Sequence, residues 1–377
     1  DDARLIGVAQ TALTGKGTEA AIDIFAPMVR DALTAVEPNV DQAGAEHIAM
    51  YKMAKGGLRD SHLIRGIAIR RRVQMDNFPN NLKNAKTAVL GGDIKIRKMA
   101  RNAEIQITSA EQLDDFVEAE SGRKQELAQS LIDSGASLIL AGGEIDRDIL
   151  HDLADAGILT VSDLDESELD NAAAATGATI IDSIIDVEPR DLGVAGSVQW
   201  ERRQATDQVE DVIIIDDCKN PAAVTLAIGG AGDTATEEII RGLHDALRAT
   251  SIALEEGQLL AGGGATHARI ANAVRKASES EPGRARLAMD AFARAMETVP
   301  ATLADNSGKD SLDTVLEMRA AAREDSDTPQ GVRADGEVGE VSGVWHPRAV
   351  IEDGLESSVE TAMSMLRIDQ VISARGD

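Results

Sequence analysis

The sequence predicts a multidomain protein that combines α and α/β domains, and three observations support this prediction. The 377 residues are enough for about two or three domains with buried cores. Between about residues 67 and 220, short β-rich runs alternate with helical segments, as is typical of an α/β domain. On both sides of this region, apolar residues recur at three- and four-residue spacing, which predicts helices.

The opening, residues 1–53, is predicted to be helical. One helix starts at Thr18 and carries a set of apolar side chains, namely Ala21, Ile22, Ile24, Phe25, Met28, Val29 and Leu33. A second helix is predicted over residues 40–52, where an apolar stretch is followed by the helix-breaking glycines Gly56 and Gly57.

The middle of the chain is predicted to alternate strands with helices. The predicted strands are 67–69, 87–90, 94–96, 105–107, 137–140, 158–161, 179–181 and 211–215. The predicted helices are 110–132, 146–156 and 166–175. After Pro221 the chain is predicted to be mainly helical, with helices at 234–256, 266–278, 283–299, 310–324 and 351–368, a loop at 325–331 and a hairpin at 332–344.

Charge and composition exclude several classes of function. The net charge of −27 should repel nucleic acid and anionic membranes. No run approaches the roughly 18 apolar residues of a transmembrane helix, and the start lacks the shape of a signal peptide. The acidic residues are dispersed, which suits solubility in molar salt and predicts a salt-loving organism. The alternative is an acidic surface for a basic partner. The single cysteine, Cys218, fits a reducing cytosol.

Residues 237–273 join two helices through three consecutive glycines. Gly262, Gly263 and Gly264 leave no β-carbon in a turn that opens into a helix. The backbone can therefore approach a ligand beside the positive end of the helix dipole. Asp245 lies upstream, on the first helix. The alternative is that the glycines serve tight helix–helix packing.

This segment resembles the ATP-site helix and glycine turn of chaperonins, in which Asp-Ala-Leu is followed by an acidic pair with glycine and then by three glycines. Further motifs follow in the order typical of the group II (thermosome) branch. They lie at 12–17, 85–90, 103–108, 111–113, 175–178, 191–193, 218–225, 302–306 and 365–369. Because they run over nearly the whole chain, the sequence is identified as a member of this family, from a haloarchaeon.

The resemblance implies a chaperonin fold with three domains. Residues 1–66 and 227–258 would form the two halves of a small mixed intermediate domain, the second with the catalytic helix. Residues 67–226 would form an α/β apical domain with a helical protrusion at about 108–131. Residues 259–377 would form the C-terminal half of a mostly helical equatorial domain. The family's Gly-Asp-Gly-Thr-Thr phosphate loop does not occur in the sequence. We therefore expect a fragment that lacks the N-terminal half of that domain.

The resemblance also implies roles for single residues. Asp245 would orient or activate the attacking water, because phosphoryl transfer depends on in-line positioning. The three glycines would pack against the nucleoside, Asn306 would contact the nucleotide, and Lys16 would reach toward the γ-phosphate. The structural alternatives are a solvated acid on a polar helix face for Asp245, an ordinary turn residue for Asn306 and a surface lysine for Lys16.

His346 departs from the family pattern. Chaperonins usually carry an acidic residue before a proline near the C-terminus, where it holds the ribose or the base edge. Here the residues are Trp345, His346 and Pro347. A histidine accepts a hydrogen bond only when it is neutral and in a suitable tautomer. A changed nucleotide affinity or base selectivity is therefore expected, and the alternatives are base stacking or a simple surface histidine.

The expected protrusion begins with a capping box, Thr108 with Glu111. Leu113, Phe116 and Val117 lie on one stripe of the following helix. In the family, apolar residues near the tip contact non-native chains, and exposed apolar side chains on so acidic a protein would form an interaction site. The alternative is that these three residues pack into the apical core.

The resemblance implies a cytoplasmic subunit that binds unfolded proteins and couples ATP hydrolysis to closure of a built-in lid in a double ring. The expected ligands are ATP and Mg²⁺, with the Mg²⁺ ligand in the missing segment and no metal site in this chain. The expected partners are unfolded client proteins and other chaperonin subunits. One alternative is a passive, non-ATPase holdase, and another is an unrelated nucleotide-dependent metabolic enzyme.

Overall fold

The computed structural model describes residues 2–18, 21–96, 110–204, 209–230, 232–323 and 328–368. The chain divides into two compact units. We call Asp31–Ile240 the middle unit and the combination of Asp1–Arg30 with Arg241–Asp377 the terminal unit. The boundary falls within two helices, α2 (Ile22–Val36) and α6 (Asp233–Glu256).

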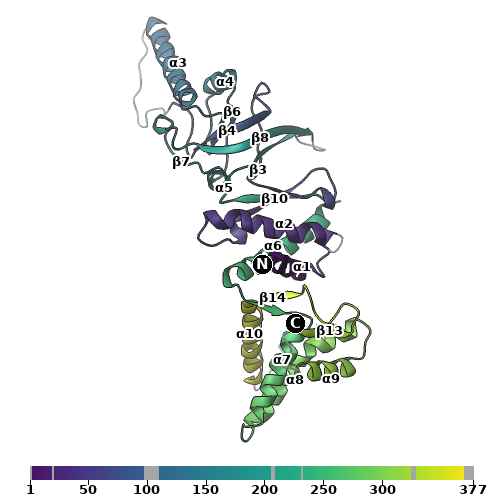
Figure 1. Ribbon diagram of the computed structural model, residues 1–377. Coiled ribbons are helices and arrows are strands. Elements are labelled where there is room, and N and C mark those ends of the chain that lie inside the picture. Colours follow the sequence, from purple (N-terminus) through teal and green to yellow (C-terminus); the bar gives the residue numbers. More distant parts are fainter. Residues whose placement is uncertain are drawn as a thin grey trace, which may run out of the picture. The chain divides into compact units, whose positions relative to one another are not determined.

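A seven-stranded sheet forms the centre of the middle unit (Figure 1). Its strands, in spatial order, are β3 (Ile67–Arg70), β9 (Val209–Asp216), β8 (Gly193–Gln204), β4 (Asn81–Leu90), β5 (Leu138–Ala141) and β6 (Leu159–Val161), and β7 (Ile180–Ile181) also pairs with β4. Neighbours from β3 to β4 are antiparallel, and those from β4 to β6 are parallel. Every residue of β5 and β6 is buried, as is usual for parallel strands that are covered on both faces. The predicted α/β region is confirmed.

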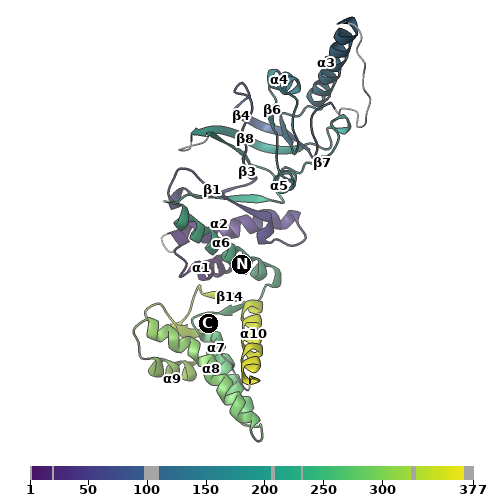
Figure 2. The same cartoon turned by 180° about the vertical axis from the view of Figure 1, so that it is seen from behind.

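The described helices of this α/β region are α3 (Ala110–Asp133), α4 (Arg147–Asp155) and α5 (Glu166–Thr176). Asp146 caps α4 by accepting a hydrogen bond from the backbone N–H of Asp148. Asp165 and Glu168 form a capping box at the start of α5, and Gly177 ends that helix in the left-handed conformation. Both views show α3 projecting beyond the sheet (Figures 1 and 2).

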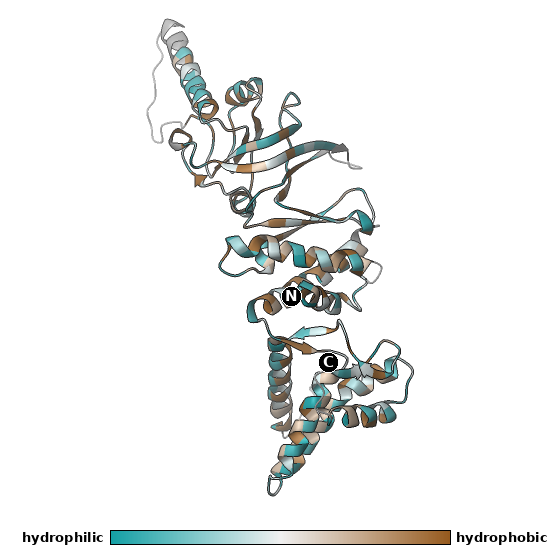
Figure 3. Ribbon diagram, viewed as in Figure 1, coloured by the Kyte–Doolittle hydropathy of each residue, from teal (hydrophilic) through white to brown (hydrophobic). Residues whose placement is uncertain are grey.

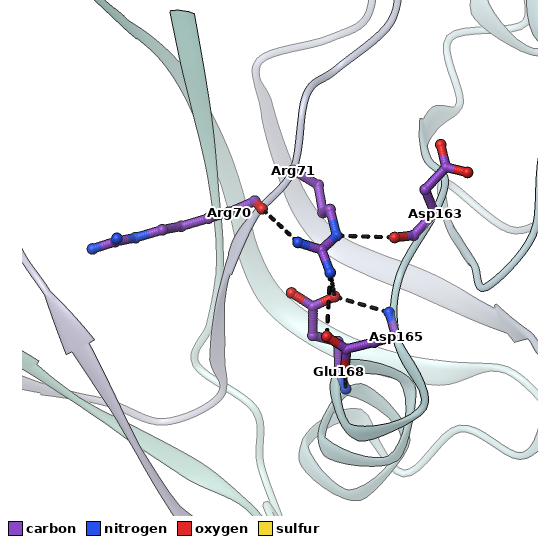
Figure 4. Close-up of polar contacts among 5 residues, drawn as sticks. All are labelled: Arg70, Arg71, Asp163, Asp165 and Glu168. Atoms are coloured by element: carbon purple, nitrogen blue, oxygen red, sulfur yellow. Dashed lines mark hydrogen bonds and ion pairs between the residues drawn. The ribbon is translucent and has the colours of Figure 1, made fainter. Parts of the chain in front are cut away.

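Arg71 joins the end of β3 to the start of α5 (Figure 4). Its Nε donates to the carbonyl oxygen of Asp163 at 2.9 Å, and its Nη2 lies 3.2 Å from Asp165 and 2.6 Å from Glu168. Nη1 donates to the carbonyl oxygen of Arg70 at 3.2 Å. A planar guanidinium can make these bonds together because its donors are held in a fixed fork. The cluster therefore fixes where α5 begins against the sheet.

A second sheet of the middle unit corrects one prediction. It has three strands, β1 (Ile48–Lys52), β10 (Val224–Ile228) and β2 (His62–Ile64). The predicted helix over residues 40–52 is wrong, because β1 pairs in parallel with β10 from Ile48 opposite Val224 to Lys52 opposite Ile228. The partner strand lies far away in sequence, and pairing with it outweighs the weak local preference for a helix.

The terminal unit is mainly helical. Its further helices are α1 (Asp2–Leu13), α7 (Ala265–Ser278), α8 (Ala285–Asn306), α9 (Ser311–Ala321) and α10 (Arg348–Leu366). Two antiparallel pairs accompany them, β11 (Leu259–Ala261) with β14 (Trp345–Pro347) and β12 (Gln330–Val332) with β13 (Val338–Glu340). Apolar and polar residues alternate along α7 and α8 (Figure 3), and the apolar Ala271, Ala293 and Met296 pack together between them.

Helix α8 extends beyond its predicted end. The predicted helix ended at residue 299, but α8 continues through Pro300 to Asn306. Pro300 is buried, and a β-carbon added at Gly264 would lie 2.8 Å from its Cβ. Burial of the ring beneath the glycine turn offsets the lost backbone hydrogen bond.

Glu297 ties three helices of the terminal unit together. Its side chain is only 7% exposed and accepts hydrogen bonds from Arg275 of α7 and Arg319 of α9. The two contacts from Arg319 are each 2.6 Å long. Burial alone would raise the pKa of Glu297, but the hydrogen bonds from Arg319 and Arg275 lower it below the usual value. We call this cluster the Glu297 brace.

The remaining predictions concern short strands and a hairpin. The hairpin predicted at 332–344 corresponds to β12 and β13, although β12 begins earlier, at Gln330. Strand β14 follows directly after the predicted segment and pairs with β11. The predicted strand 94–96 is reduced to a single bridge between Ile94 and Ile145. The predicted strand 105–107 lies outside the described residues. None of the helices in the described segments combines the length and apolar character needed to cross a lipid bilayer.

Candidate functional site

The glycine turn leads from β11 directly into α7. Gly263 and Gly264 have φ angles of 62° and 75°, which side chains rarely adopt. A β-carbon at Gly263 would lie 2.8 Å from the carbonyl oxygen of Val332. The backbone N–H of Val332 also donates to the carbonyl oxygen of Gly263, at 2.8 Å. Contacts within the chain therefore already require glycine at these two positions. The turn also leaves the first N–H groups of α7 at the positive end of the helix dipole.

His346 lies beside this turn. It pairs with Leu260 across the β11–β14 ladder, and a β-carbon at Gly262 would lie 3.2 Å from its Nε2. Burial lowers the pKa of His346, and the nearby His267 of α7 lowers it further. Burial also lowers the pKa of His267. At neutral pH both rings are therefore uncharged, and each has one nitrogen that accepts a hydrogen bond.

The structure brings Lys16 and Asp245 together. The Nζ of Lys16 lies 2.5 Å from Oδ2 of Asp245, although the two residues are 229 positions apart. The side chains are 34% and 47% exposed, so both can also meet a ligand from solvent. The turn that carries Lys16 is held by Thr18, whose hydroxyl donates to the carbonyl oxygen of Leu13 at 2.6 Å. A lysine and a carboxylate in this arrangement can hold an anion and orient a water.

Asn306 is exposed at the C-terminal end of α8. It lies six residues beyond Pro300, or about 9 Å along the helix axis, and Pro300 packs beneath Gly264. The loop that follows Asn306 is held by an ion pair between Lys309 and Glu337 of the β12–β13 turn. Among the described residues, no hydrogen bond or ion pair joins Asn306 to the Lys16–Asp245 pair.

The residues of the expected protrusion, about 108–131, lie largely on α3. Val117 is more than half exposed on it, whereas the side chains of Leu113 and Phe116 lie outside the described part of the structure. The Nζ of Lys124 holds α3 to the start of α4, at 3.1 Å from Asp146 and 2.8 Å from Asp148. The hydrogen bonds that Lys124 donates to Asp148 and Asp146 raise its pKa.

A groove lies beside α3 that was not predicted from the sequence. It encloses about 600 Å³ and is lined by Arg123, Glu126 and Leu127 of α3 and by Ile184 and Ile185. Ile185 is 75% exposed, which is unusual for so large an apolar side chain. The sequence signal for this groove was the isoleucine-rich run at 180–185. The prediction used only the first part of this run, as a strand at 179–181.

No metal site occurs among the residues that the structure describes. They hold no group of three or more His, Cys, Asp or Glu side chains able to bind a metal ion. The carboxylate of Asp245 is already paired with Lys16. The described part of the chain therefore does not fit Mg²⁺ by itself, since this ion prefers several oxygen ligands with octahedral geometry.

Comparisons with known proteins give the family. The chain matches the TCP-1/cpn60 chaperonin family over residues 1–376. It is 36% identical to the thermosome subunit beta of Methanothermobacter thermautotrophicus, covering 98% of this chain and 68% of that protein. It is 37% identical to the thermosome subunit of Methanopyrus kandleri, covering 100% of this chain and 69% of that protein.

A solved structure agrees with these relatives. The open-state monomer of a group II chaperonin from Methanococcoides burtonii superposes with a TM-score of 0.62 and 26% sequence identity. The match covers 98% of this chain and 86% of that one. The predicted fold class is confirmed, and the chain belongs to the group II, or thermosome, branch of the TCP-1/cpn60 chaperonin family.

Proposed function

We propose that this chain works as an ATP-hydrolysing subunit of a cytosolic group II chaperonin ring that binds and folds unfolded proteins. Membership of the thermosome branch supports the activity. The observation that carries the assignment to residues is the Lys16–Asp245 pair, because it joins two motif positions that are 229 residues apart. A passive holdase would need neither residue.

In this proposal the nucleotide lies against the glycine turn. The N–H groups at the start of α7 suit an anionic ligand. Neutral His346 would accept a hydrogen bond from a ribose hydroxyl, in place of a carboxylate. Asn306 would contact the nucleotide from the end of α8. We expect weaker ribose binding than with a carboxylate, since a hydrogen bond to a charged acceptor is about twice as strong as a neutral one.

Asp245 and Lys16 would act at the third phosphate. Asp245 accepts a hydrogen bond from the attacking water and holds it in line with the bond that breaks. Lys16 is a compact charge on a flexible stem, so it can leave Asp245 for the γ-phosphate and return after hydrolysis. Their partial exposure permits this exchange, since an exposed ion pair is worth only about 0.2–1 kcal/mol.

We propose that Mg²⁺ is held by a part of the subunit that this chain does not include, the N-terminal half of the equatorial domain. The chain covers about two thirds of the relatives named above. Helix α10 supports the proposal, because none of its residues is buried and Val359, Met363 and Leu366 form an exposed apolar stripe. Measuring the intact mass of the native polypeptide tests this, and a mass of 39.8 kDa would contradict it.

The middle unit would bind the unfolded client. Val117 on α3 and the neighbouring groove with Ile184 and Ile185 offer apolar surface on a chain of net charge −27. In molar salt, screening removes the repulsion between acidic surfaces and leaves apolar contact as the main attraction. We therefore propose a haloarchaeal source for the subunit. We also propose that the subunit assembles into a ring of like or mixed subunits, and that α3 forms part of the lid.

Substitution of Asp245 tests the enzymatic part of the proposal. We expect Asp245→Asn to reduce ATP turnover by about a hundredfold to ten-thousandfold, and to change stability by less than about 1 kcal/mol. Glu237→Gln is the matched control, because Glu237 is an exposed acid on the same helix that also pairs with a lysine, Lys52. Equal turnover in both variants would contradict the role of Asp245. Capture of unfolded protein without any ATP turnover would favour the passive holdase.

A further inference from the structure

Strand β14 makes close contacts with helix α1 inside the terminal unit. The backbone N–H of Trp345 donates to the hydroxyl of Thr11 at 3.2 Å. The guanidinium of Arg4 lies 5.4 Å from the centre of the Trp345 ring, a cation–π contact. Both contacts involve the residue directly before His346.

Gly7 brings the helix and the strand together between these two contacts. A β-carbon at Gly7 would lie 2.8 Å from the carbonyl oxygen of Gly343 and 2.8 Å from Cδ1 of Trp345. The hydroxyl of Thr11 donates to the carbonyl oxygen of Gly7 at 2.7 Å and is thereby oriented to accept from Trp345. Arg4, Gly7 and Thr11 are spaced by three and four residues, so they share one face of α1.

The C-terminal end of α1, which carries Thr11, leads into the turn that carries Lys16. Helix α1 has 12 residues and is therefore about 18 Å long. The backbone N–H of Thr14 donates to the carbonyl oxygen of Gln10 at 3.1 Å, which continues the helical hydrogen bonding into this turn. A displacement of the face of α1 that contacts Trp345 can therefore reach Lys16 with little bending, because the helix is continuously hydrogen-bonded up to the turn that carries Lys16.

We propose that α1 is a rigid link between two parts of the nucleotide site, and that Trp345 and Thr11 are positioning residues through which β14 sets the place of Lys16. A nucleotide that shifts His346 also shifts Trp345, its neighbour on β14. The face of α1 formed by Arg4, Gly7 and Thr11 follows, and Lys16 moves relative to Asp245. This inference rests on the proposed function.

The discriminating measurement is the affinity for ATP compared with that for ADP, each with Mg²⁺, by calorimetry on the native assembly. Lys16 is proposed to meet only the third phosphate, so its misplacement weakens ATP and spares ADP. We expect Thr11→Val to weaken ATP binding by about threefold to tenfold, the loss of one hydrogen bond, with ADP binding unchanged. Thr11→Ser keeps the hydroxyl and should restore ATP binding.

A matched control and a spectroscopic signal complete the test. Thr361→Val removes a hydroxyl that also bonds four residues back in its own helix, on α10, and should leave both affinities unchanged. The chain has two tryptophans, so Trp200→Phe leaves Trp345 as the reporter. In that background we expect ATP to shift the Trp345 emission, and to shift it less in Thr11→Val.

The possible outcomes separate this inference from the function on which it rests. Equal loss of ATP and ADP binding in Thr11→Val would mean a general structural role and would overturn the link. So would nucleotide binding that leaves the Trp345 emission unchanged. If the assembly with unchanged sequence binds neither nucleotide, the proposed nucleotide site fails and the link fails with it.

Discussion

Removing the charge at the centre of the Glu297 brace should weaken the terminal unit strongly. Glu297→Gln keeps the shape of the side chain but leaves Arg275 and Arg319 without their shared counter-ion. Breaking a buried ion pair from one side costs about 3–5 kcal/mol. The two arginines are 28% and 39% exposed and can regain water, so we expect the lower end, about 3 kcal/mol. This corresponds to about a hundredfold change in the opening equilibrium.

Hydrogen exchange is the suitable assay, because a chain with two compact units need not unfold in one step. We expect the protection of α7, α8 and α9 to fall about a hundredfold in Glu297→Gln, while the strands of the middle unit keep theirs. Glu360→Gln, at an exposed acid of α10, is the control and should change nothing.

A charge-free version of the brace separates packing from charge. Replacing Glu297, Arg275 and Arg319 together by Met, Met and Leu should recover most of the lost stability, because apolar residues of similar volume can replace a buried ionic cluster. Since hydrogen bonds lower the pKa of Glu297, the brace stabilises the fold above the ordinary pKa of 4.5 and is lost as the pH falls below it. A change in opening energy below about 1 kcal/mol in Glu297→Gln would refute the reasoning.

Two further predictions concern the glycine turn. Gly264→Ala should destabilise the terminal unit by about 2–4 kcal/mol, because the added methyl meets Pro300 at 2.8 Å in a left-handed conformation. The control is Gly257→Ala, because Gly257 also has a positive φ, of 65°, but has open space around it. It should lower the free energy of unfolding by only about 1–2 kcal/mol, measured by chemical denaturation. Equal losses of stability in the two variants would exclude the Pro300 contact as the cause. Burial lowers the pKa of His346 below 6.5, so the unfolded state binds more protons and stability falls as the pH drops below that value. The measurement is the Tm as a function of pH, and we expect the Tm of His346→Gln to fall less at low pH than that of the unchanged protein. The same dependence of Tm on pH in both proteins would contradict the burial of a neutral imidazole.

Much of the fold could be predicted where a pattern is local. Helices α3 to α9 follow apolar spacing and capping residues within one segment, as the capping box of Asp165 and Glu168 shows. The buried strands β5 and β6 were found because they are short apolar runs between turns. Strands β1, β2, β8 and β10 were missed, since a strand becomes stable only beside a partner that its own residues do not identify.

The candidate site likewise combines residues that a local motif identifies with contacts that only the folded chain reveals. Asp245, Lys16 and the glycine turn could be selected from motifs, and their roles stay predictions that the variants above will test. The exposed Ile185 beside α3 gave only a weak signal, because an apolar residue in a strand-like run is usually buried. The contact of Trp345 with Thr11 gave no signal at all, because the two residues are 334 positions apart.

The resemblance of motifs, in their order along the chain, was enough to identify the family, and the alternation of strand-like and helical patterns was enough to predict the class of fold. Both are properties of the linear chain. Three other features were decided only when the chain folded: the partner of β1, the pairing of Lys16 with Asp245, and the face of α1 that meets β14. Neighbours in sequence determine which conformation and burial suit a residue. Contacts between distant segments depend on which combination of them buries apolar surface and satisfies backbone hydrogen bonds at the same time.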